Sequence, residues 1–74
     1  MTIEFIKILE AALEAANRSD KWFAQWKETK HEFDHRAWSE YEAQAEAYCN
    51  AYEILTGIRV IPCAVFIENE IAKA

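Results

Sequence analysis

Two histidines, His31 and His35, are the residues of this 74-residue chain whose types and spacing come closest to a chemical site. Side chains four residues apart share one face of a helix, so both imidazoles can meet a single ion there. Carboxylates that would complete the ligand set are close by, with Glu28 before the pair and Glu32 and Asp34 between the two histidines. Because imidazole and carboxylate suit zinc or a related ion, a metal-binding helical protein is one hypothesis for the function.

Asp34 supports a plainer interpretation of the same residues. It is a competent N-cap for a helix that begins at His35, and a helix boundary there takes His31 off the face that carries His35. The polar side chains then surround a helix junction in water, which is the interpretation we favour, and no cofactor is expected. The histidines also lack a nucleophile with a matched base, so we do not expect an enzyme.

The elements that position these residues are predicted to be helices. Apolar residues recur at intervals of three and four positions over residues 3–17, which predicts an amphipathic helix with Thr2 as its N-cap. Residues 17–20 are types that favour helix ends and starts, so we expect a break there and a short helix over residues 21–31. The apolar face of the first helix consists of Phe5, Ile6, Leu9, Ala12, Leu13 and Ala16.

The strongest periodicity predicts a long helix over about residues 34–56. Its apolar residues follow one another by three or four positions, as in the seam of a coiled coil. Gly57 ends this helix, because glycine adopts the left-handed conformation without steric cost, and Pro62 opens a last helix over about residues 62–73. The sequence therefore predicts one all-α domain, residues 1–74, folded as a small bundle of three to four helices. The seam consists of Trp38, Tyr41, Ala45, Tyr48, Tyr52 and Leu55.

The aromatic residues point to contact with another protein. Three Trp, three Tyr and four Phe are more flat apolar surface than 74 residues hide easily. Trp22 and Phe23 point about 100° apart on a helix, so both are buried only if that helix is surrounded. Since Trp, Tyr and Arg dominate interface hot spots, we predict a partner-binding site at Trp22, Trp26 and Arg36.

Self-association is the second interaction that the sequence predicts. A helical chain of this size gains little net stability from its own core, and a symmetry mate adds buried apolar surface. We therefore expect a C2 homodimer through the long helix. Its predicted dimer seam consists of Trp38, Tyr41, Tyr48, Tyr52 and Leu55.

The charge balance disfavours direct binding to nucleic acid. Eight Lys and Arg stand against 13 Asp and Glu, for a formal charge of −5, whereas affinity for phosphate backbones comes from clustered cations. Four glutamates of the long helix offer a third hypothesis, a DNA mimic that occupies the basic cleft of another protein. A solvated helix face that keeps the protein soluble is the simpler interpretation. The four residues are Glu40, Glu42, Glu46 and Glu53.

The remaining features suggest a cytoplasmic location. Cys49 and Cys63 form no disulfide framework or CxxC pair, the N-terminus has no export signal, and the longest uncharged apolar stretch is too short to span a membrane. In size, acidity, helicity and aromatic content the chain resembles the small accessory proteins of phages and mobile elements, some of which inhibit host defence. We expect a small acidic, non-enzymatic protein-binding module of accessory or inhibitor type.

Overall fold

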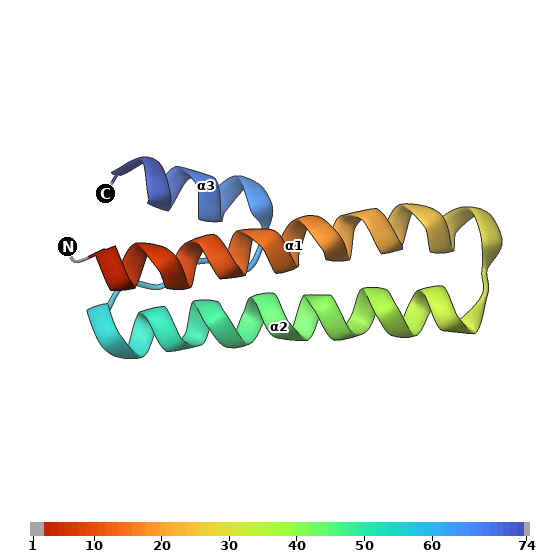
Figure 1. The fold of residues 1–74 in the computed structure, drawn as a ribbon, viewed down its shortest axis with the longest axis horizontal. Helices are drawn as coiled ribbons and strands as arrows, with labels where there is room; N and C mark the ends of the chain where they lie inside the picture. The colour runs from red at the N-terminus through yellow and green to blue at the C-terminus, as the bar shows by residue number, and fades with distance from the viewer. Residues whose placement is uncertain (1–2, 74) are drawn as a thin grey trace.

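The described residues, 3–73, form three α-helices and no strand in this computed structural model, which confirms an all-α fold. α1 (Ile3–Thr29) and α2 (Glu32–Thr56) run antiparallel as a long hairpin, and α3 (Ala64–Lys73) lies beside the first half of α1 (Figure 1). The molecule measures 42 × 19 × 16 Å. We call the end of the hairpin at residues 30–31 the tip, and the opposite end the base.

α1 is continuous through residues 17–20, so the predicted break there is wrong. Ser19 faces inward and is buried, and its hydroxyl donates to the Trp38 carbonyl oxygen at 3.4 Å. Arg18 and Glu14 form an ion pair one turn apart at 2.6 Å. Because no glycine or proline interrupts the segment, packing on α2 overrides the local preference of these residue types for helix ends. The predicted N-cap, Thr2, lies outside the described residues.

A two-residue turn at residues 30–31 separates α1 from α2. Lys30 adopts the left-handed conformation, with φ 55°, and its N–H donates to the Trp26 carbonyl oxygen at 2.7 Å. The N-cap of α2 is His31, whose Nδ1 accepts from the Phe33 N–H at 3.1 Å. The prediction that Asp34 caps this helix is therefore wrong: α2 begins at Glu32, three residues before His35, and Asp34 lies inside its first turn.

The end of α2 matches the prediction, and the start of α3 does not. Gly57 has φ 75°, and its N–H donates to the Glu53 carbonyl oxygen at 2.7 Å, so glycine ends α2 in the left-handed conformation. The first hydrogen bond of α3 runs from the Ile67 N–H to the Cys63 carbonyl oxygen at 3.0 Å. Pro62 therefore lies before the N-cap position of α3 and not at its first helical position.

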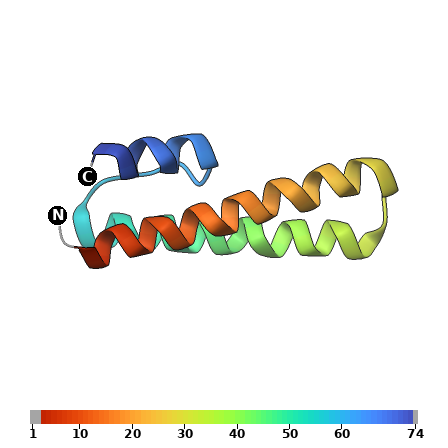
Figure 2. The same ribbon diagram turned by 45° about the horizontal axis from the view of Figure 1, so that its top comes forward.

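α3 and the linker of residues 57–63 cover one face of the hairpin. The linker passes behind α1 in Figure 1 and beneath α3 in Figure 2. Val60 of the linker and Ile67 of α3 are buried in the same core as Leu9 and Tyr52. Within the described residues α3 packs against α1 and makes no close backbone approach to α2. The hairpin is thus sealed on one side only.

The core is small for the number of apolar residues in the chain. Tyr52, Leu9 and Ile67 are the largest fully buried side chains, and the remaining buried hydrophobic residues are mostly small. Large apolar side chains are left on the surface in their place. The exposed ones are Phe33, Tyr48, Ile54, Leu55, Ile58, Ile61, Val65 and Phe66.

Candidate protein-binding surface

Aromatic rings fill the tip of the hairpin, between the end of α1 and the start of α2. Trp26 stacks on Trp38 with ring centroids 5.7 Å apart, and Phe23 lies 4.7 Å from Trp38. The Lys30 ammonium lies 4.3 Å from the centre of the Trp26 ring, which is a cation–π distance. Trp26, a predicted partner-binding residue, is therefore half-buried inside this cluster, and its direct contact with a partner stays a prediction.

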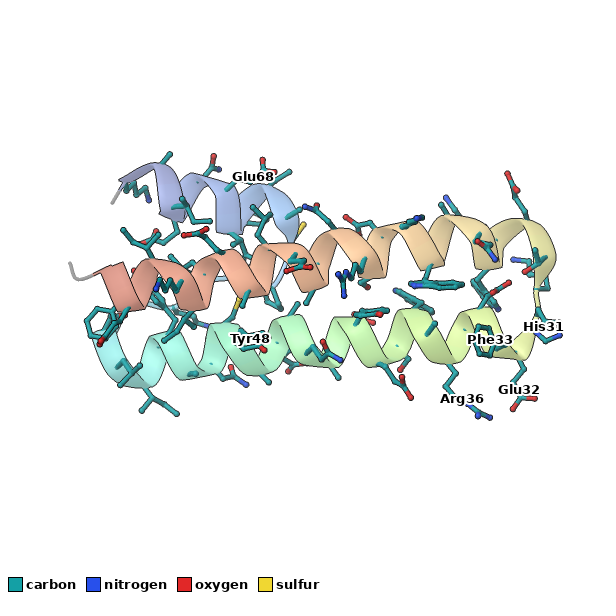
Figure 3. All side chains as sticks on the ribbon, in the orientation of Figure 1. His31, Glu32, Phe33, Arg36, Tyr48 and Glu68 are labelled. Atoms are coloured by element: carbon teal, nitrogen blue, oxygen red, sulfur yellow. The ribbon has the colours of Figure 1, made fainter. Side chains whose placement is uncertain are left out.

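Trp22 and Arg36, the other predicted partner-binding residues, lie at the rim of the same cluster. Trp22 meets Phe33 edge to face at 6.0 Å, and Phe33 is 60% exposed. Arg36 is exposed and pairs loosely with Glu32 at 3.7 Å. Figure 3 shows Arg36 and Glu32 projecting from the start of α2, away from α1. Sequence analysis missed Phe33, although an apolar residue among the charged residues of a helix start is an available signal.

The two histidines have structural contacts in this cluster. His31 is the N-cap of α2, and His35 packs against Trp26 and Trp38 with ring centroids 5.3 and 5.2 Å away. Residues 31–35, His-Glu-Phe-Asp-His, match the HExxH pattern of zinc proteases, with Glu32 in the position of its glutamate. No group of three or more His, Cys, Asp or Glu side chains in residues 3–73 is arranged to hold a metal ion.

Asp34 joins the two helices at the tip. The carboxylate is buried, and it accepts hydrogen bonds from Gln25 Nε2 at 3.1 Å and from Thr29 Oγ1 at 2.5 Å. Thr29 Oγ1 in turn accepts from the His31 N–H at 3.2 Å. This network ties the last turn of α1 to the first turn of α2, and so it fixes the position of the aromatic cluster.

The predicted dimer seam is divided between the core and the surface. Tyr52 is fully buried between the helices, and Trp38 and Tyr41 are half-buried against α1. Tyr48 and Leu55 remain 41% and 55% exposed. The periodicity therefore marks the packing of α2 on α1 within one chain, and a dimer contact through the seam stays a prediction.

The face of the hairpin that α3 and the linker leave uncovered carries a hollow of about 170 Å³. α1 and α2 alone line it. Across it the Arg18 guanidinium, paired with Glu14, lies 5.7 Å from the centre of the Tyr41 ring. We call this surface the open face. Its residues are Ala11, Glu14, Ala15, Arg18, Tyr41, Gln44 and Tyr48 at the hollow, Leu55 towards the base, and Trp22 with Phe33 towards the tip.

Comparison with protein-family models, curated proteins and solved structures gives no match to this chain. The described part of the chain contains no helix with the length and apolar character needed to cross a membrane.

The four glutamates predicted to imitate DNA do not form one line on α2. All four are exposed. At about 100° per residue, Glu42, Glu46 and Glu53 fall within roughly 40° of one another, whereas Glu40 lies on another side of the helix. A phosphate-like array would thus lack one of its members, and DNA mimicry stays a prediction without geometric support.

The buried hydroxyl of Tyr52 should make the protein less stable at alkaline pH. Burial raises the pKa of its hydroxyl, and the Glu70 carboxylate raises that pKa further. Folding thus favours the neutral hydroxyl over the phenolate. The contribution of Tyr52 to the free energy of unfolding is therefore fully present below the unfolded pKa of about 10 and is lost as pH rises above that value. We expect the melting temperature to fall above about pH 10, and to fall less steeply in Tyr52→Phe. Equal slopes for both proteins in a thermal melt series would contradict this assignment.

Proposed function

We propose that this protein is a non-enzymatic protein-binding module and that the open face is its binding surface. The observation that carries the proposal is the one-sided packing of the hairpin. α3 and the linker seal one side, while on the other side Tyr48, Leu55 and Phe33 keep 41%, 55% and 60% of their surface exposed to water. Exposed apolar side chains on a helix face that no other element of the chain covers are typical of an interaction surface.

The total surface area supports the proposal. A compact monomer of 8.6 kDa exposes about 4,700 Å² by the usual scaling with mass, and this chain exposes 5164 Å², about a tenth more. The excess reflects an elongated shape around a small core. Covering the open face with another protein would bring the exposed area per chain down to that of an ordinary domain.

The residue types on the open face also fit a protein interface. Tyr41, Tyr48 and Arg18 lie around the hollow, and Trp22 lies towards the tip. Tyr, Trp and Arg are enriched at interfaces and dominate their hot spots. Trp22, one of the three predicted contact residues, and the exposed part of the predicted seam thus belong to one surface. A module of this kind acts by occupying its partner, which is how small accessory and inhibitor proteins work.

A site-specific photo-crosslinker tests this function in the cells that make the protein. Benzophenone-alanine at position 48 lies on the open face, and the same residue at position 65 of α3 is the control, because Val65 is 61% exposed on the opposite side of the core. We expect irradiation to give a discrete protein adduct from position 48, with little from position 65. Equal or absent crosslinking at the two positions would rule out the open face as the binding surface.

A further inference from the structure

We infer that the partner covering the open face is a second copy of this chain, packed antiparallel to the first. This inference rests on the proposed function and names the occupant of the same surface. Three observations carry it: the position of the hollow along the hairpin, the distribution of charge between tip and base, and the size of the broad side of the molecule.

The hollow lies at the middle of the hairpin. Its residues come from positions 11–18 of α1, which spans Ile3–Thr29, and from positions 41–48 of α2, which spans Glu32–Thr56. A twofold axis through this point places each hairpin along the whole length of the other. An isologous contact needs a self-complementary patch, and here Arg18 of one copy faces Glu14 of the other on both sides of the axis.

Large side chains stand at equal distances from this centre. Along α2, Phe33 lies eleven residues before Gln44 and Leu55 lies eleven residues after it. In an antiparallel pair each exposed Phe33 therefore meets the exposed Leu55 of the other copy. Apolar side chains thus contact each other at both ends of the interface.

The charge of the chain changes along the long axis. Residues 21–36, which surround the tip, carry four Lys or Arg and three acids, and the rest of the chain carries four Lys or Arg and ten acids. An antiparallel pair sets each weakly positive tip beside an acidic base. A parallel pair would bring the two acidic bases together, which is electrostatically unfavourable.

The open face is large enough for a stable dimer. The broad side of the molecule, with α3 along one edge, measures 42 by 19 Å, an outline of about 800 Å². One partner contributes about 800 Å² to an interface of standard size. Figure 1 looks down the shortest axis, onto this side. A second hairpin on this face would complete a four-helix bundle, in which each copy supplies α1 and α2.

Absolute mass by light scattering, measured over a dilution series, tests self-association. We expect a mass near twice 8.6 kDa for the wild type. Tyr48→Lys places a charge on the open face, and we expect it to raise the dissociation constant about 30-fold or more, as loss of an interface hot spot does. Leu55→Lys is a second variant at the same surface. Circular dichroism checks that each variant keeps its helices.

Ile54→Lys is the matched control, because Ile54 is 84% exposed and lies about 120° around α2 from Tyr48. We expect this variant to dimerise like the wild type. Loss of the dimer in Ile54→Lys, with the dimer kept in Tyr48→Lys and Leu55→Lys, would overturn the inference.

The distance between spin labels tests the orientation. The label is placed at Glu32→Cys in a Cys63→Ala background, since Cys49 is buried and Glu32 projects from the tip (Figure 3). Glu32 lies twelve residues from the centre of α2, so an antiparallel dimer separates the two labels by about 36 Å along the helix axis. A parallel dimer holds them within about 20 Å, because packed helices lie 8–10 Å apart. The short distance would contradict the antiparallel arrangement.

The two proposals fail in different ways. If the protein is a monomer at all concentrations and position 48 still crosslinks to another protein, the second copy is wrong as the occupant and the open face remains the binding surface. A monomer with no specific crosslink at position 48 overturns both.

Discussion

Replacing Tyr52 with alanine is expected to lower the free energy of unfolding by about 3–5 kcal/mol, the usual loss for truncating a buried aromatic ring. Tyr52 is fully buried between α1 and α2, in the core that also holds Leu9 and Ile67. Its neighbours there include several alanines, which cannot expand into the vacated space. A domain of this size has only a few kcal/mol of stability to lose, so the variant should be largely unfolded at 25 °C.

Urea or thermal unfolding followed by circular dichroism measures this loss. Phe66→Ala is the matched control, because Phe66 is an aromatic residue of α3 that remains 49% exposed. We expect the control to lose about 1 kcal/mol or less. If Tyr52→Ala and Phe66→Ala were equally stable, the core would not lie where the structure places it.

Asp34→Ala is expected to cost about 2–3 kcal/mol, because it removes two hydrogen bonds to a buried carboxylate and leaves Thr29 Oγ1 and Gln25 Nε2 without their acceptor. It also removes an anion from the first turn of α2, where the helix dipole favours negative charge. The loss should appear at the tip. We expect faster hydrogen exchange of the backbone amides around residues 29–35 and altered fluorescence of Trp26 and Trp38.

Two comparisons isolate the role of this network. Asp34→Asn keeps one carbonyl acceptor and should lose about half as much as Asp34→Ala. Glu32→Ala removes a neighbouring carboxylate that is exposed and 3.7 Å from Arg36, so it should change stability by less than about 0.5 kcal/mol. A larger loss for Glu32→Ala than for Asp34→Ala would show that charge near the helix start, and not the buried network, stabilises the tip.

Helical periodicity predicted the fold class because it reports which residues face a neighbour. The spacing from Trp38 to Leu55 identified the side of α2 that packs, and Tyr52 near the end of this span is fully buried. The same spacing does not reveal which neighbour is present. Packing against a helix of the same chain and packing against a helix of a second chain require the same apolar stripe. The sequence pattern of an intramolecular hairpin is therefore the same as that of a dimer seam.

The helix boundaries were predicted less well because they depend on contacts between distant residues. Ser19 has the side chain of a helix cap, yet it lies within α1, where its hydroxyl reaches the Trp38 carbonyl oxygen nineteen residues away. Asp34 likewise has the side chain of an N-cap, but its carboxylate accepts hydrogen bonds from Gln25 and Thr29 of α1. Both residue types are suited to capping a helix. In the folded chain, their side chains instead form hydrogen bonds with residues of the neighbouring helix.

The open face could not be predicted from periodicity at all. Tyr41 and Tyr48 are seven residues apart and so lie on the same side of α2, but their exposure depends on which side of the hairpin α3 and the linker cover. That choice follows from Val60 and Ile67 entering the core beside Leu9. Nothing in the order of the helices along the chain decides it.

The continuity of α1 means that its two halves share one rotational phase. The first half presents Leu9 and Ala12 to the core, and the second half presents Trp26 to the cluster at the tip. A single residue inserted near Ser19 would turn the tip half by about 100° relative to the base half and carry Trp26 away from Trp38. Relatives of this chain should therefore differ in hairpin length by whole turns, three or four residues added to α1 and matched by as many in α2.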